Sequence, residues 1–181
     1  MKKIVLFLLL IMAVFCSTAA MNASAAAYRN NYLNEVRTTK LHPNTIKVWV
    51  QDSQYKGTAY DAFNEWVAAS GGCISFREAN TPKTANIVVY FVDKLPGPAV
   101  GVTTYSRPIS IRVATIRYGM KNTKISKREA YPILVHEIGH ALGIQGHSSN
   151  NNDIMYPNTN IIGIHASDRD VNTIRAMYCR K

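Results

Sequence analysis

From residue 45 onward the chain contains short stretches in which apolar residues recur either at every second position or about every 3.6 positions. Apolar residues at every second position of residues 45–51 predict a half-buried strand. Residues 85–92 form a continuous apolar run, which is typical of a strand buried on both faces. Further short strands are predicted at residues 73–77, 101–105 and 109–115.

Two helices are predicted from a period of about 3.6 residues. The first lies before Gly71 and Gly72, which end it, and its apolar face is formed by Tyr55, Ala59, Ala62, Phe63, Trp66 and Val67. The second opens at Ser167, three residues before Asp170, and carries the apolar residues Val171, Ile174, Met177 and Tyr178.

A third helix is predicted between these two, in residues 126–142. Ser126 and Glu129 have the spacing of a capping box, and an apolar stripe follows them. Pro132 removes a backbone hydrogen-bond donor, so the helix either begins at this proline or is kinked there. Gly143 is expected to end the helix, because glycine adopts a left-handed conformation without steric penalty.

The third helix carries the chemistry of the chain. His136 and His140 are four residues apart, so both imidazoles lie on one helical face and can reach one metal ion. Glu137 lies beside the first histidine, where a carboxylate can take a proton from a metal-activated water. This pattern of two histidines and a glutamate is a signature of zinc proteases.

A catalytic zinc ion takes three protein ligands and keeps one position open. His147 is the expected third ligand, because no cysteine or carboxylate lies in the stretch between the helix and this residue. Asp153 and His165 are weaker alternatives, since Asp153 suits a turn and His165 lies much further along the chain. His42 is interpreted as an ordinary exposed residue.

The segment from His136 to His147, followed by Met155, resembles the metzincins, and most closely the matrixin branch. In the family pattern two residues separate the glycine from the third histidine. Here Ile144, Gln145 and Gly146 make three, which adds at most about 3.5 Å of chain. We expect Gly146 to fold this extra length into a small bulge.

The resemblance covers residues 41–179 and implies an α+β fold. A twisted, mostly parallel five-stranded sheet with an antiparallel edge strand is expected, together with an active-site helix and a C-terminal helix. Met155 would form an apolar floor under the three imidazoles. An extended polypeptide substrate would lie along the edge strand at Gly101, Val102, Thr103 and Thr104. The specificity pocket is expected within residues 158–164.

The N-terminus has the layout of a secretory signal. Two lysines precede an apolar run, and Ala23-Ser24-Ala25 forms a cleavage site, so residues 1–25 are assigned to a signal peptide. The apolar run is too short to span a membrane comfortably. We therefore expect a secreted, extracellular protein in which a lead segment, residues 26–40, precedes one catalytic domain, residues 41–181. After signal removal two cysteines remain, Cys73 and Cys179, which could form a disulfide or stay as buried free thiols.

The net charge of the chain says little about which molecules it binds. Without Lys2 and Lys3, 19 Lys and Arg residues remain against 11 Asp and Glu. Such a surplus favours anionic surroundings but is also an ordinary solubility charge, and no nucleic-acid-binding motif is present.

The sequence thus predicts a monomeric, secreted zinc endopeptidase with one Zn²⁺ ion held by His136, His140 and His147 and with Glu137 as general base. The alternatives are a secreted zinc-binding module without turnover and a zinc amidase that acts on cell-wall peptides.

Overall fold

The computed structural model describes residues 41–157 and 164–179. Its elements follow the order expected from the sequence, with one additional 3-10 turn: β1 (Ile46–Val50), α1 (Lys56–Ser70), β2 (Phe76–Glu78), η1 (Pro82–Thr84), β3 (Ile87–Val92), β4 (Gly101–Thr104), β5 (Ile109–Ala114), α2 (Lys127–Leu142) and α3 (Asp168–Tyr178). The five strands form one sheet in the order β2-β1-β3-β5-β4. All neighbouring strands pair in parallel except β4, which runs antiparallel to β5 at the edge of the sheet. The predicted α+β fold is confirmed.

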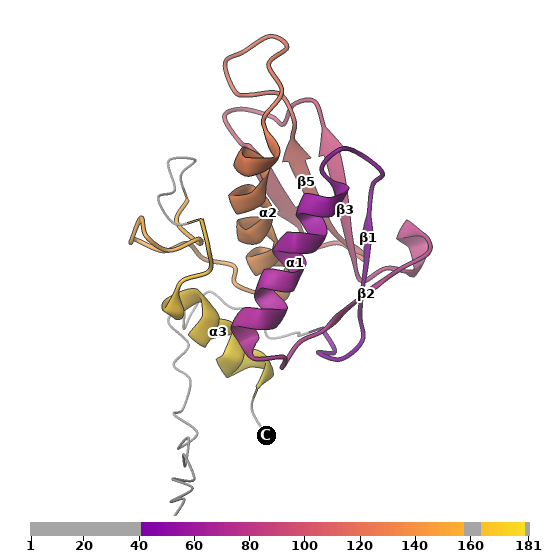
Figure 1. Ribbon diagram of the computed structural model, residues 1–181, viewed down its shortest axis with the longest axis vertical. Helices are drawn as coiled ribbons and strands as arrows, with labels where there is room; N and C mark the ends of the chain where they lie inside the picture. The colour runs from indigo at the N-terminus through magenta and orange to yellow at the C-terminus, as the bar shows by residue number, and fades with distance from the viewer. Residues whose placement is uncertain (1–40, 158–163, 180–181) are drawn as a thin grey trace, which may run out of the picture.

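Helices α1 and α2 lie side by side over one face of the sheet, and α3 lies beyond their lower ends (Figure 1). The inward residues of β1, β3 and β5 alternate with outward ones, as the period of two requires, and pack into a core with both helices. Trp66 of α1 is fully buried, and its Nε1 donates a hydrogen bond to the carbonyl oxygen of Val135 in α2, 2.9 Å away. Burying this large indole fixes α2 against α1.

One local expectation needs correction, and one alternative that the sequence left open is excluded. Strand β2 begins at Phe76 rather than at Cys73, because the backbone N–H of Ser75 bonds to Pro43 instead of joining the ladder with β1. Helix α2 begins at Lys127, so it does not start at Pro132, which lies inside the helix. The capping box of Ser126 and Glu129 sets this earlier start, because it satisfies backbone donors at the true N-terminus.

The C-terminal helix is fastened to the rest of the domain at its last turn. Cys73 and Cys179 form a disulfide in the structure, which links the end of α3 to the segment after α1. The hydroxyl of Tyr178 donates to the carbonyl oxygen of Leu142, the last residue of α2, at 2.7 Å. Helix α3 therefore supports the end of the helix on which the predicted metal site lies.

Candidate metal centre and active site

The three predicted histidine ligands come together at the end of α2. His140 Nε2 lies 3.1 Å from His136 Nε2 and 3.2 Å from His147 Nε2. Helix α2 ends at Gly143, whose φ of 121° is a conformation that favours glycine and turns the chain back toward the two helical histidines. His136 and His140 are buried and His147 is exposed, so the group faces solvent on one side.

Backbone carbonyls orient the two buried imidazoles. His136 Nδ1 lies 2.6 Å from the carbonyl oxygen of Ile154, and His140 Nδ1 lies 2.6 Å from that of Ile144. A carbonyl oxygen only accepts, so both Nδ1 atoms carry the proton and both Nε2 atoms present a lone pair. The converging Nε2 atoms of these two residues are therefore free to bind a cation.

The donor set fits zinc. Tetrahedral zinc with Zn–N distances near 2.05 Å requires ligand nitrogens about 3.3 Å apart, close to the 3.1 and 3.2 Å separations in this site. Burial lowers the pKa of His136 to about 3, with the neighbouring His140 adding to the effect, and burial lowers the pKa of His140 to about 4. Both imidazoles are thus neutral at physiological pH, which is the form that binds a metal.

Glu137 is held between α2 and the edge strand β4. Its side chain is buried, and the hydroxyl of Thr103 donates a 2.6 Å hydrogen bond to Oε2. A Cβ atom on Gly101 would lie 2.5 Å from Oε1, so only glycine leaves room for the carboxylate at this point of β4. Burial raises the pKa of Glu137 to about 7, and the hydrogen bond from Thr103 opposes that rise.

Met155 lies directly under the helix that carries the histidines. It is fully buried, and a Cβ atom on Gly139 would lie only 2.6 Å from its Sδ. Gly139 is three residues after His136 and therefore shares its helical face. The sequence assigned Met155 to a floor under the imidazoles, and the structure places it against this face.

Helix α3 reaches the site through a buried carboxylate. Asp170 caps α3 at Ser167, and its Oδ2 also accepts a hydrogen bond from the backbone N–H of Ile154 at 3.0 Å. The carbonyl oxygen of the same Ile154 is the partner of His136 Nδ1. Asp170 therefore helps to fix the orientation of a metal-binding imidazole, a role that its capping pattern alone did not reveal.

The alternative ligands lie apart from the histidine cluster. Asp153 accepts a hydrogen bond from Ser148 Oγ, and His165 Nδ1 lies 3.1 Å from Glu65 Oε2 on α1. His42 is exposed. Of the described residues, His136, His140 and His147 form the group of three that could hold a metal ion.

The extra residue before His147 lies in the segment that joins α2 to this histidine. Gly146 is at a bend of the chain, and its backbone φ is not positive. Ile144 is fully buried, with its backbone N–H bonded to the carbonyl oxygen of Gly139 and its own carbonyl oxygen bonded to His140. The expected specificity pocket falls on residues 158–163, which lie outside the described residues, and on Ile164, which is exposed.

Comparison with known proteins agrees with this geometry. Residues 114–179 match the matrixin family model. The resemblance inferred from the sequence is thereby confirmed for the part of the chain that holds α2, the three histidines and Met155. No curated protein matches the chain.

The chain also has the fold of two solved structures. It is similar to the structure of myroilysin, with 15% sequence identity and a TM-score of 0.55, over 81% of this chain and 98% of that one. It is similar to archaemetzincin from Methanopyrus kandleri, with 14% identity and a TM-score of 0.54, over 80% of this chain and 100% of that one. The matrixin match and the three histidines together imply a zinc site.

Proposed function

We propose that this protein is a secreted zinc endopeptidase in which Glu137 is the general base. The observation that carries the proposal is a buried carboxylate on Glu137, the residue after the first of three histidines whose ring nitrogens converge. A purely structural zinc site fills its fourth position with a protein ligand and needs no base. Here no fourth ligand joins the histidines among the described residues, and Glu137 is held by β4 instead.

The residues of the site have separate tasks in this proposal. The zinc ion, when bound, polarises the scissile carbonyl and makes an attacking water molecule easier to deprotonate. Thr103 holds Oε2 of Glu137, which leaves Oε1 to accept the proton from the attacking water. Glu137 then delivers this proton to the leaving amine. Burial raises the pKa of Glu137 above that of an ordinary carboxyl group, which favours its acceptance of a proton.

The edge strand β4 supplies the substrate path. It pairs with β5 on one side and ends the sheet on the other, so its backbone can pair with an extended peptide as an added strand. Gly101 and Thr103 face Glu137, whereas Val102 and Thr104 are exposed. A peptide along this edge passes the catalytic carboxylate and needs no free terminus, which favours cleavage within a chain.

Two substitutions test this assignment. Glu137→Gln should keep about one zinc per chain, measured by elemental mass spectrometry, and should lower the cleavage of casein by about 10²- to 10⁴-fold. His140→Ala should lose both zinc and cleavage. Glu78→Gln and His42→Ala are matched controls on β2 and before β1, and both should behave like the wild type.

Three outcomes decide between the proposal and its alternatives. Full peptidase activity in Glu137→Gln would overturn the role of the base. A wild-type chain that binds zinc but cleaves neither casein nor a peptide library would favour a zinc-binding module, or an amidase if it releases cell-wall peptides.

Secretion is tested separately, because the protein recovered from culture medium should begin after Ala25. None of the helices in residues 41–157 and 164–179 has the length and apolar character that a membrane span requires.

A further inference from the structure

A hollow lies beyond the start of the edge strand. Its volume is about 290 Å³, and it lies between the loop after β3, residues 93–100, and the connection from β5 to α2, residues 115–126. The lining side chains that matter for binding are Lys94, Leu95, Arg117, Tyr118, Met120 and Lys121. It contains none of the three histidines and does not include Glu137.

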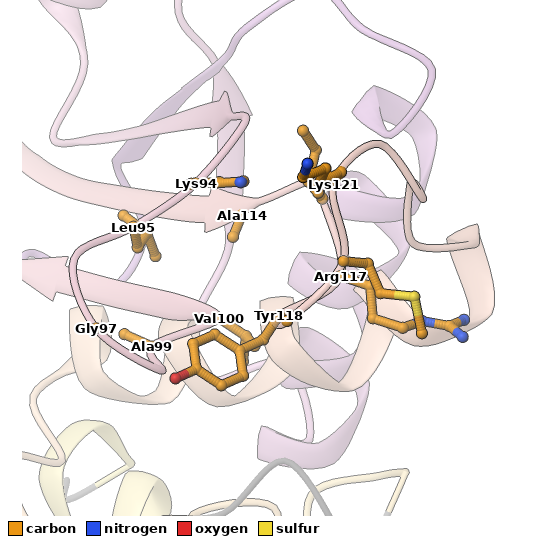
Figure 2. A pocket seen from close by; sticks show the side chains of 12 residues that line it. Lys94, Leu95, Gly97, Ala99, Val100, Ala114, Arg117, Tyr118 and Lys121 are labelled. Atoms are coloured by element: carbon orange, nitrogen blue, oxygen red, sulfur yellow. The ribbon is translucent and has the colours of Figure 1, made fainter.

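This basic pocket, as we name it, continues the line of β4. The carbonyl oxygen of Val100 accepts a hydrogen bond from the N–H of Ala114 at 2.8 Å, so the ladder with β5 already begins one residue before Gly101. Val100 and Ala114 both line the pocket. Figure 2 shows Tyr118 next to Val100, where the chain enters β4, and Leu95 on the opposite loop. A peptide paired with β4 would reach this pocket as it leaves Gly101.

The pocket has a distinct charge. Three of its lining residues are cationic, and none of the described residues that line it is acidic. Arg117 is neutralised by Glu129, 2.5 Å away, whereas Lys94 and Lys121 form no ion pair within the described residues. Two positive charges therefore remain to interact with a ligand.

The walls of the pocket are apolar and open. Tyr118 is 64% exposed and Met120 is 47% exposed, the two largest values among the exposed large hydrophobic residues that the structure describes. Exposed apolar side chains beside lysines suit a ligand with an apolar stem and an anionic end. A glutamate or aspartate side chain of a polypeptide has this chemistry.

We propose that the basic pocket is a substrate subsite that receives an acidic side chain of the polypeptide segment running past the N-terminal end of β4. This inference rests on the proposed peptidase function. It assigns to Lys94 and Lys121 the selection of the acidic residue, and to Tyr118 the contact with its stem. The reacting atoms lie elsewhere, so the pocket affects which chain is cut and leaves the chemistry to Glu137 and the metal.

The test uses the zinc-loaded mature chain and a library of peptides made by digesting a whole proteome. Mass spectrometry of the products should show Asp and Glu enriched at a position within about four residues of the scissile bond, on one side only. In the double variant Lys94→Glu/Lys121→Glu this enrichment should disappear or change to Lys and Arg. Preferences at the two residues that flank the scissile bond should stay unchanged.

The matched control carries the same charge change on β1 and η1, away from the edge strand. Lys47 lies on β1 and Lys83 in η1, and both are exposed, so Lys47→Glu/Lys83→Glu should keep the acidic preference. Loss of the preference in this control as well would assign it to the overall charge and overturn the subsite. An active wild type without acidic preference would overturn the subsite and leave the peptidase intact. A wild type that cuts nothing would overturn the proposed function together with the subsite.

A pair of synthetic peptides gives the size of the effect. The best-cleaved library sequence is made with Glu or with Gln at the selected position. Exposed ion pairs with two lysines should favour Glu in kcat/KM by about three- to ten-fold at low salt, and about 0.5 M salt should reduce this ratio toward one. An equal ratio in wild type and in Lys94→Glu/Lys121→Glu would contradict the assignment of these two lysines.

Discussion

Adding one methyl group to Gly101 should damage catalysis without removing the metal. A Cβ atom at this position would lie 2.5 Å from Glu137 Oε1, 2.8 Å from Cγ and 2.9 Å from Cδ. The neighbouring backbone belongs to a paired strand and is held by β5, so it cannot withdraw easily. In Gly101→Ala the carboxylate of Glu137 must therefore move.

The size of the effect follows from these distances. Ordinary contact begins near 3.4 Å, so Oε1 has to retreat by about 0.9 Å. Such a shift also weakens the 2.6 Å hydrogen bond from Thr103 to Oε2. A displacement of about 1 Å in a catalytic group costs about 10²-fold in rate. We therefore expect kcat/KM of Gly101→Ala to fall about 100-fold, which corresponds to about 2.7 kcal/mol of transition-state stabilisation.

Fluorogenic peptide hydrolysis and zinc analysis measure the two halves of this prediction. Zinc content should stay at the wild-type level, because the three atoms nearest to the new methyl group all belong to Glu137 and none to a histidine. Gly57→Ala in α1 is the matched control, since no atom lies within 4 Å of its added Cβ. Activity of Gly101→Ala within about threefold of the wild type would refute the reasoning.

Three further predictions concern stability, measured as the free energy of unfolding in urea. Gly139→Ala should lose about 1–3 kcal/mol by overpacking against Met155, 2.6 Å from the added Cβ, and the loss should shrink in a Met155→Ala background. Replacing Cys73 and Cys179 by serine should cost about 3–5 kcal/mol, because the disulfide closes a loop with a sequence separation of 106; a loss below 1 kcal/mol would contradict this. In the metal-free protein, the lowered pKa values of the two α2 histidines make the unfolded state bind about two more protons between pH 5 and 6, while the raised pKa of Glu137 makes the folded state bind about one more. The unfolded state thus binds about one proton more than the folded state, so the free energy of unfolding should rise by about 1.4 kcal/mol for each pH unit in this window. A flat or falling curve would contradict the pKa shifts of these three groups.

The architecture could be predicted because each element carries a local signal. The alternation in residues 45–51 survives as β1, with Ile46, Val48 and Val50 buried. Both predicted capping patterns, at Ser126 and at Ser167, form capping boxes in the structure. Strand β2 was placed less well, because its start depends on a hydrogen bond to the segment before β1, which lies far away in the sequence.

The histidine cluster could be predicted for the same local reason, whereas its supports could not. His136 and His140 are fixed by helical spacing, and Gly143 provides the turn that follows. Thr103 lies 34 residues before Glu137, and nothing in its local pattern indicates that it holds the carboxylate. The contacts of Ile144 in the longer loop could not be predicted either, because its burial depends on the packing of the whole core.

The end of α2 shows why the site and the core share their stability. Two separate segments bond to this one turn, where Tyr105 donates to the carbonyl oxygen of His140 and Tyr178 to that of Leu142, and within the turn the carbonyl oxygen of Ile144 orients His140. The last carbonyl groups of a helix have no partner inside the helix, and two of these bonds use such groups. The third bond uses the carbonyl group of Ile144, just beyond the helix end. The same contacts that complete the helix therefore position the imidazoles. A substitution that loosens α3 should lower zinc affinity even when it touches no ligand, because Tyr178 of α3 helps to hold the turn that positions the imidazole nitrogens.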